Sequence, residues 1–111
     1  MNQVILVGRI AKPIEIQEYD KHKVAYLTLA VQRLYKNKDN IYETDFIQVV
    51  LWNGIAENLQ KFATVGDCIG IKGRIENDNY TDKDGNQKYG YQIIAEIANV
   101  VSRVNHDSKE E

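Results

Sequence analysis

Aromatic and basic side chains concentrate in residues 30–52, and these residue types are the best suited to a chemical role in this chain. The candidates on this stretch are Tyr35, Tyr42, Phe46, Trp52, Arg33, Lys36 and Lys38. Flat aromatic faces beside positive charge on a β-surface suit stacked nucleobases and a phosphate backbone. The same aromatics also suit an ordinary strand, because Tyr, Phe and Trp are favoured in sheets. The stretch by itself leaves both interpretations open.

Catalytic and metal-binding patterns are absent from the sequence. It contains no P-loop, no G-x-S-x-G and no H-E-x-x-H motif. One of its two histidines, His22, stands in a polar turn and the other in the last seven residues, so few groups are suited to act as a base near neutral pH. The lone Cys68 can form neither an internal disulfide nor a cysteine-based metal site. The sequence therefore predicts no enzyme, no metal site and no cofactor.

Length and charge describe one globular domain without a strong electrostatic field. The chain has 111 residues, of which 43% are hydrophobic and 27% charged, as in an ordinary globular domain. The net charge is −2, whereas nucleic-acid-binding domains are usually basic. Three acids and one lysine lie in the last seven residues, so residues 1–104 carry 13 cationic and 13 acidic side chains. A neutral body can still carry a positive groove, but its balance argues against strongly salt-dependent binding.

Targeting and membrane signals are also missing. No apolar run approaches the roughly 20 residues that span a bilayer. The N-terminal MNQVILVGRI has neither the basic start nor the cleavage site of a secretory signal. We therefore expect a cytoplasmic protein with no membrane partner.

Hydrophobic periodicity predicts a mostly β chain. The expected strands cover residues 4–10, 24–34, 42–52, 68–80 and 89–104, with pairing resuming briefly at 14–19. Glycines inside the first and fourth strands indicate bulges or bends. Asp39-Asn40 and Asp84-Gly85-Asn86 supply turn chemistry between neighbouring strands.

A single short helix follows the third strand. Ile55, Leu59 and Phe62 fall on one helical face. Asn53 is the expected N-cap and Gly66 the expected C-terminal stop. The amphipathic pattern predicts that the helix closes one end of a sheet.

This order of elements predicts an all-β fold with one short helix, the five-stranded Greek-key barrel of the OB type. Three strands precede the helix and two follow it, and glycine bends allow tightly curved strands to close a barrel. In such barrels the binding surface is formed by the face of the second and third strands, together with the loops between strands one and two and between strands four and five. We expect the domain to cover residues 1–104 and a short, disordered polar tail to cover 105–111.

Five stretches carry a family resemblance: NQVILVGRI, VAYLTLAV, TDFIQVVLWNGIAENL, VGDCIGIKGRI and NYTDKDGNQKYGYQI. Over residues 1–104 the chain resembles the bacterial and phage single-stranded DNA-binding proteins. The resemblance implies an OB-fold that assembles as a homotetramer. It also implies sequence-independent binding and protection of single-stranded DNA in replication, recombination or repair.

The resemblance also implies which residues bind DNA. By position, the stacking aromatics are Tyr35, Phe46, Trp52 and Tyr80. The cations best suited to phosphate contact are Arg33, Lys36, Lys38, Lys72, Arg74, Lys83 and Lys88. Lys72 and Arg74 equally suit a solvated strand face, Trp52 has a core-packing alternative, and Tyr26 and Tyr91 are left unassigned between core and surface.

The chain departs from the family pattern in two places. After the GRI of the fourth strand, where the family commonly carries arginines before the aromatic, this chain reads Glu76-Asn77-Asp78-Asn79, and these acids repel phosphate. The family usually ends in a linker and an acidic tip that recruits repair and replication enzymes, whereas this sequence ends in KEE. We therefore expect a short form without recruitment through that tip, which fits a paralogue or a phage or plasmid protein.

Two other functions remain open from the sequence. An OB-fold protein-interaction module of a replication-restart complex suits the near-neutral body and the acidic end of the fourth strand. An RNA-binding, cold-shock-like barrel ranks lower, because this chain is longer and carries a helix between its third and fourth strands.

Overall fold

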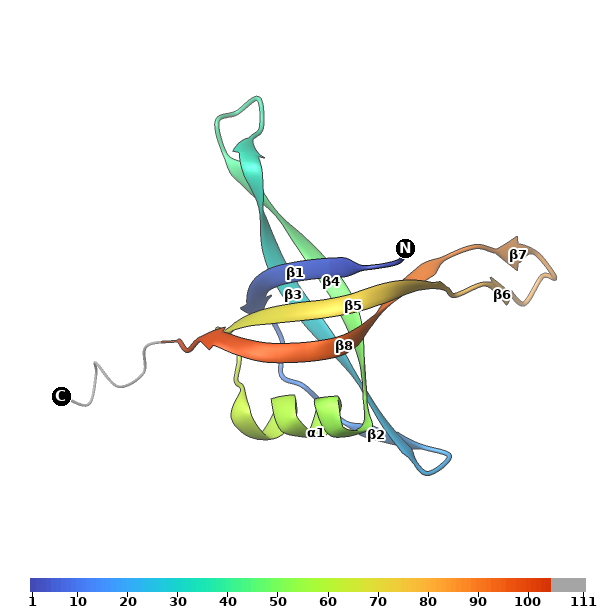
Figure 1. Cartoon of the computed structure of the whole chain (residues 1–111). Coiled ribbons are helices and arrows are strands. Elements are labelled where there is room, and N and C mark those ends of the chain that lie inside the picture. Colours follow the sequence, from blue (N-terminus) through green and yellow to red (C-terminus); the bar gives the residue numbers. More distant parts are fainter. Residues whose placement is uncertain (105–111) are drawn as a thin grey trace.

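The computed structural model describes residues 1–104, so the predicted tail at 105–111 lies outside the described residues. The elements are β1 (Val4–Ile10), β2 (Gln17–Tyr19), β3 (His22–Lys36), β4 (Tyr42–Trp52), α1 (Asn53–Phe62), β5 (Cys68–Asn77), β6 (Tyr80–Thr81), β7 (Gln87–Lys88) and β8 (Tyr91–Ser102). The five long strands match those predicted, and the three short strands extend the hairpins (Figure 1).

The long strands form a closed barrel, which confirms the predicted OB-type fold. The sheet order is β1-β5-β8-β4-β3-β2, and β1 also pairs with β3 through Arg9↔Ala30 and Ile10↔Leu29. Among the described residues, β4 and β8 pair in parallel at two positions, Val49↔Ile93 and Val50↔Ile94. All the other strand pairs are antiparallel. The barrel therefore closes at one end of β1 and along a short β4–β8 join.

Alternating residues of the long strands fill the barrel. The side chains of Leu27, Leu29, Val49, Leu51 and Ile69 are all fully buried. Burying one such side chain contributes about 1.5–3 kcal/mol relative to leaving it exposed. Helix α1 packs its Ala56 and Leu59 against this core and covers the lower end of the barrel in Figure 1, as its amphipathic pattern predicted. None of the helical structure in residues 1–104 has the length and apolar character needed to cross a bilayer.

The predicted ends of the helix were wrong. Trp52 occupies the N-cap position without a side-chain cap, and Asn53 is the first helical residue. The Asn53 Oδ1 instead accepts a hydrogen bond from the backbone N–H of Lys23, at 2.9 Å. The helix ends at Phe62, and Gly66 follows in a turn with φ of 97°. A contact between distant segments has replaced the local cap.

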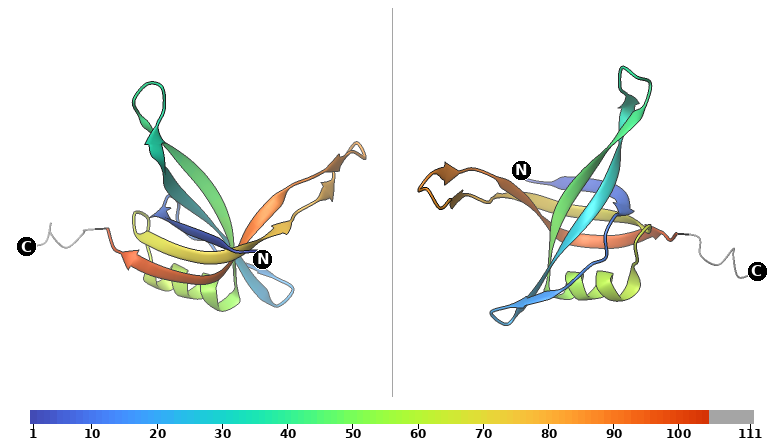
Figure 2. Two further views of the ribbon diagram at one scale, coloured as in Figure 1. Left: turned by 45° about the horizontal axis from the view of Figure 1, so that its top comes forward. Right: turned by 180° about the vertical axis from the view of Figure 1, so that it is seen from behind.

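Two hairpin arms extend beyond the barrel and diverge from each other (Figure 2). The first is the outer part of β3–β4, which has a register shift between Gln32 and Lys36. The second continues β5 and β8 into β6–β7. At the first tip the Asn37 Oδ1 accepts two backbone N–H bonds, and at the second tip the Asp82 Oδ1 does the same. The predicted turn at Gly85 is confirmed, with φ of 80°.

A glycine in β5 allows β8 to approach closely. The β5–β8 register shifts between Lys72 and Gly73, so the fourth strand bends as predicted. A Cβ atom at Gly73 would collide with the carbonyl oxygen of Ile94. Since that oxygen belongs to backbone rather than to a flexible side chain, the collision can be relieved only by moving a strand.

We expect Gly73→Ala to lower the free energy of unfolding by about 1–3 kcal/mol, as overpacking does. Gly54→Ala is the matched control, since no atom lies within 4 Å of a Cβ built there. It should leave stability unchanged or raise it by up to about 1 kcal/mol, because alanine favours a helix. Chemical denaturation monitored by circular dichroism measures both, and equal stabilities for the two variants would contradict the close approach.

Candidate nucleic-acid interface

The four aromatics assigned to the site are surface residues. Tyr35 is 66% exposed, Phe46 67%, Trp52 37% and Tyr80 58%. The core-packing alternative considered for Trp52 therefore does not describe its side chain. Tyr35 lies near the end of β3 on one arm, Tyr80 begins β6 on the other, and the remaining two lie on β4.

The outer side of the β3–β4 hairpin carries Phe46 and Trp52 together. Alternate residues of a strand face the same side, and Val49 and Leu51 point into the core. Phe46, Gln48 and Trp52 therefore point outward. In the β3–β4 register Phe46 lies opposite Ala30 and Trp52 opposite Val24, both small enough to leave the rings accessible. The predicted shared face is present.

Tyr26 is a further aromatic on this side that the sequence left unassigned. It lies opposite Val50 in the β3–β4 register, between the levels of Phe46 and Trp52, and its side chain is exposed. Alternation along residues 24–34 was the available signal, but the apolar pattern there changes face, which obscured the direction of Tyr26.

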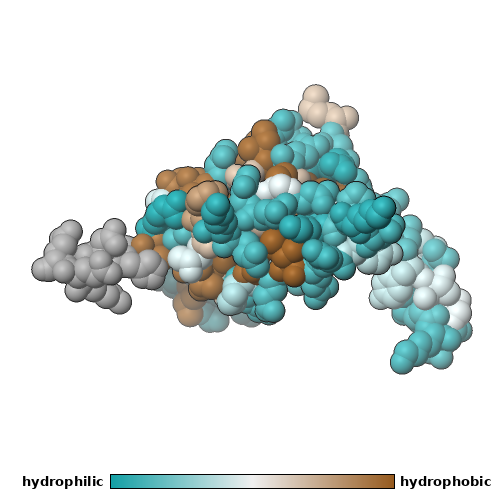
Figure 3. All heavy atoms as spheres, turned by 90° about the horizontal axis from the view of Figure 1, so that it is seen from below, coloured by the Kyte–Doolittle hydropathy of each residue, from teal (hydrophilic) through white to brown (hydrophobic). Residues whose placement is uncertain are grey.

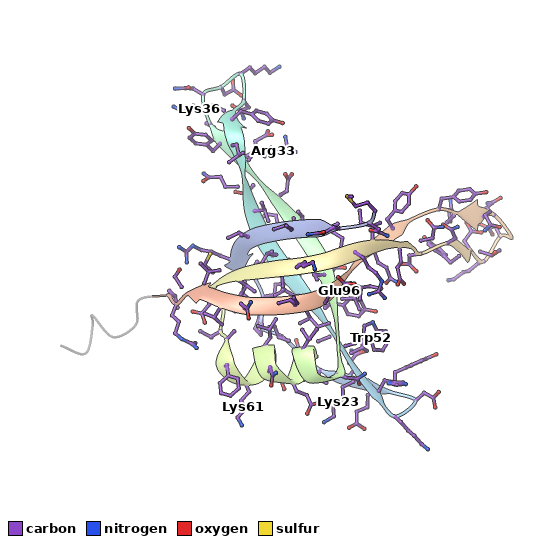
Figure 4. All side chains as sticks on the ribbon, in the orientation of Figure 1. Lys23, Arg33, Lys36, Trp52, Lys61 and Glu96 are labelled. Carbon is purple, nitrogen blue, oxygen red and sulfur yellow. The ribbon has the colours of Figure 1, made fainter. Side chains whose placement is uncertain are left out.

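Trp52 contacts His22, the first residue of β3. The rings of His22 and Trp52 meet edge to face, with centroids 6.3 Å apart and an interplanar angle of 89°. The Asn53 side-chain nitrogen lies 3.4 Å from His22 Nδ1. Figure 4 places Trp52 where β4 meets α1, at the opposite end of β4 from the arm that carries Arg33 and Lys36. His22 therefore contacts a site residue, rather than being only a solvated turn residue.

The two assigned arginines are paired with carboxylates of their own chain. Arg33 donates to Glu43 at 2.7 Å and to Asp45 at 2.9 Å. The hydrogen bond from the Arg33 guanidinium lowers the pKa of the Asp45 carboxyl, and the same bond raises the pKa of Arg33. The Arg33 guanidinium is therefore not free to bind an anion in this arrangement. The same holds for Arg74, which is also paired with carboxylates.

Arg74 lies between Glu76 and Glu96. Its Nη2 is 2.6 Å from Glu76, and its Nη1 is 3.4 Å from Glu96. The Glu76 hydrogen bond is the main cause of the raised pKa of Arg74. The acidic residue that the sequence marked as repelling phosphate therefore neutralises a neighbouring cation.

The assigned lysines are more open than the arginines. Lys88 lies 3.8 Å from Asp82, and Lys36 stands over the Tyr42 ring at 5.5 Å. Through residues 1–104 no ion pair engages the other three, which are exposed: Lys38, Lys72 and Lys83. Lys38 and Lys83 lie at the two arm tips. No group of three or more His, Cys, Asp or Glu side chains in the described part of the chain is placed to hold a metal ion.

Lys72 lies on a different surface from Phe46 and Trp52. It stands opposite Ile5 of β1 and Ile97 of β8. These neighbours are exposed and apolar. The structure thus brings Phe46 and Trp52 together on one face, carries Tyr35, Tyr80 and the tip lysines on the arms, and separates Lys72 from them.

Comparison with known proteins identifies relatives over nearly the whole chain. The profile of the Single-strand binding protein family matches residues 1–102. Single-stranded DNA-binding protein 1 of Streptococcus pyogenes is 39% identical over 93% of this chain and 80% of its own length. Single-stranded DNA-binding protein 2 of Listeria innocua is 38% identical over 96% of this chain and 67% of its own. The single-stranded DNA-binding protein of Streptococcus mutans is 39% identical over 86% of this chain, which spans 59% of that relative.

A solved structure has the same fold. The crystal structure of the small single-stranded DNA-binding protein from Streptomyces coelicolor superposes with a TM-score of 0.66. It is 21% identical, and the match covers 88% of this chain and 92% of the other.

The Arg33–Asp45 pair predicts a measurable titration. We expect Arg33→Gln to raise the pKa of the Asp45 carboxyl toward its ordinary value, because its hydrogen-bond donor and nearby positive charge are lost. Since the folded-state pKa is the lower one, the pair stabilises the fold above the ordinary carboxyl pKa and loses this effect as the pH falls through the folded-state value. Carboxyl carbon NMR titration measures the shift. The control is Lys23→Gln, which breaks the distant Lys23–Glu57 pair and should leave the pKa of Asp45 unchanged. An unchanged Asp45 pKa in Arg33→Gln would contradict the conclusion that Arg33 lowers it.

Proposed function

The chain belongs to the single-strand binding protein family, and from this membership we propose that it binds single-stranded DNA without regard to sequence. Bases stack on exposed aromatic side chains while lysines contact phosphates. The protein is a binding protein and not an enzyme. Its proposed roles are to coat and protect exposed strands during replication, recombination or repair, in the cytoplasm, where such strands arise in bacterial cells.

The observation that carries this proposal is the exposed aromatic pair on the outer side of β4. Phe46 exposes two thirds of its surface, and Trp52 exposes more than a third of its own, on the outer side of this strand. Accessible aromatic rings on a β-surface are the platforms on which successive bases of a single strand stack. A single strand that continues along this hairpin would also reach Tyr35, which lies on β3 in the same arm, while Tyr80 lies on the other arm, which diverges from it (Figure 2).

The charge arrangement predicts a shallow salt dependence. Each phosphate contact on a single strand contributes a slope of about −0.7 to the dependence of binding on salt concentration. The arm-tip lysines Lys38 and Lys83 are available for such contacts, whereas Arg33 and Arg74 must first leave their carboxylates. Phosphate contacts therefore contribute less to the binding free energy than the number of cations suggests, and stacking supplies most of the affinity.

The proposed assembly is a homotetramer, which the outer face of β1, β5 and β8 supports. Exposed apolar side chains gather there around Lys72: Ile5, Val7, Ile97 and Val101. In residues 1–104, the part of β1 from Val4 to Gly8 pairs with β5 alone, so its other edge is open to a strand of a second copy. By contrast, the β6–β7 arm, at the right of Figure 3, is covered by hydrophilic and neutral side chains.

Titration of the single Trp52 with oligo-dT, beside a duplex control, tests the proposed binding. We expect quenching by the single strand alone. Phe46→Ala should weaken binding by about 1–3 kcal/mol, the value of one stacked base. The matched control is Phe62→Ala, which removes the other phenylalanine of the chain, exposed on α1. If a labelled oligonucleotide also shows no binding, DNA binding is wrong and the protein-interaction module becomes the better account.

Light scattering on purified protein tests the assembly. We expect the mass of four chains for the wild type and a smaller assembly for the double variant Val7→Lys/Ile97→Lys, because two buried lysines would have no partner. Val65→Lys alters an exposed residue after α1 and is the control. A folded double variant with the wild-type mass would show that this face is not the interface.

A further inference from the structure

We propose that a hollow between the two arms seats one unstacked base of the bound strand, with Tyr91 as its second aromatic wall. This inference rests on the proposed function and adds a base-binding subsite to it. Tyr91 was left unassigned by the sequence, and its side chain is 77% exposed.

The hollow exists because β4 and β8 separate. Their parallel pairing in the described chain is confined to Val49↔Ile93 and Val50↔Ile94. Away from α1, toward the arm tips, the two strands diverge. The space between them has a volume of about 490 Å³ and is lined by Phe46, Ile47, Gln48, Ile75, Tyr91 and Ile93. That volume lies within the usual range of small-molecule sites.

The lining has the chemistry of a nucleobase site. Ile47 and Ile93 pack against the barrel core and, with Ile75, form an apolar floor. Phe46 from β4 and Tyr91 from β8 present aromatic rings from opposite strands. A base offers two apolar faces to such rings, and its polar edge can pair with the Gln48 amide, which both donates and accepts hydrogen bonds. No charged side chain lines the hollow, so a phosphate is not the group that it suits.

Continuity with the outer side of β4 identifies the occupant as a base of the same strand. Phe46 belongs both to the proposed stacking face and to the wall of the hollow. Gln48 also lines the neighbouring groove with Tyr26 and Thr28. A strand stacked along the outer side of the hairpin therefore passes the mouth of the hollow, and one base can turn inward there.

A tryptophan placed at the hollow reports on its occupant directly. In a Trp52→Phe background, which retains a ring at position 52, Tyr91→Trp puts the sole indole at the hollow. Tyr89→Trp in the same background is the matched control, since Tyr89 is 79% exposed two residues away and does not line the hollow. We expect oligo-dT to quench the indole at position 91 strongly and the indole at position 89 weakly.

A second measurement uses the wild-type background. Tyr91→Ala should reduce affinity for a labelled oligo-dT on the order of ten-fold, the loss of one stacked base, whereas Tyr91→Phe and Tyr89→Ala should not. The subsite is wrong, and the proposed function stands, if the wild type binds labelled DNA while the indole of Tyr91→Trp is not quenched and Tyr91→Ala binds with unchanged affinity. If Tyr91→Ala changes the assembly mass but not the affinity, the hollow is a protein contact. A wild type that binds no single strand overturns both proposals.

Discussion

The short parallel join between β4 and β8 is the constraint on which this molecule depends. Parallel neighbours cannot be connected by a tight turn, so the chain passes through α1 and β5 before β8 reaches β4. Two residue pairs along this seam in residues 1–104 complete the barrel around its core. Because the seam is short, the hairpins on either side of it separate beyond the barrel. The same join therefore closes the core and opens the side that we propose binds DNA.

Features governed by near neighbours in the chain were readable from the sequence. Alternation of apolar residues predicted the long strands, and glycines predicted the bend in β5 and the turn at Gly85. The helix cap was predicted wrongly because Asn53 binds the backbone of Lys23, a residue 30 positions away. The candidate stacking aromatics could be named from the sequence. The Arg33–Asp45 pair could not be predicted, because it depends on the β3–β4 register. The hollow beside Tyr91 depends on two strands meeting through a join that leaves no local pattern.

Charge neutrality also has a structural explanation. The acids that offset the cations are not spread at random, because two arginines near the binding side each hold two carboxylates. Such exposed pairs contribute little to stability. Their larger effect is on the surface field, which they reduce beside aromatic rings that remain accessible. In the proposed binding, stacking on these rings determines where a strand lies, and long-range attraction has a lesser part.

The arms separate the proposed DNA contacts from the stability of the fold. Each tip is organised by one side chain, Asn37 or Asp82, through bonds to its own loop. The core residues lie in the barrel and not in the arms. Residues can therefore be gained or lost at a tip without disturbing the barrel, since exposed loop tips tolerate such changes. Under the proposed function, evolution can lengthen or shorten the stretch of DNA that one chain covers while the scaffold stays the same.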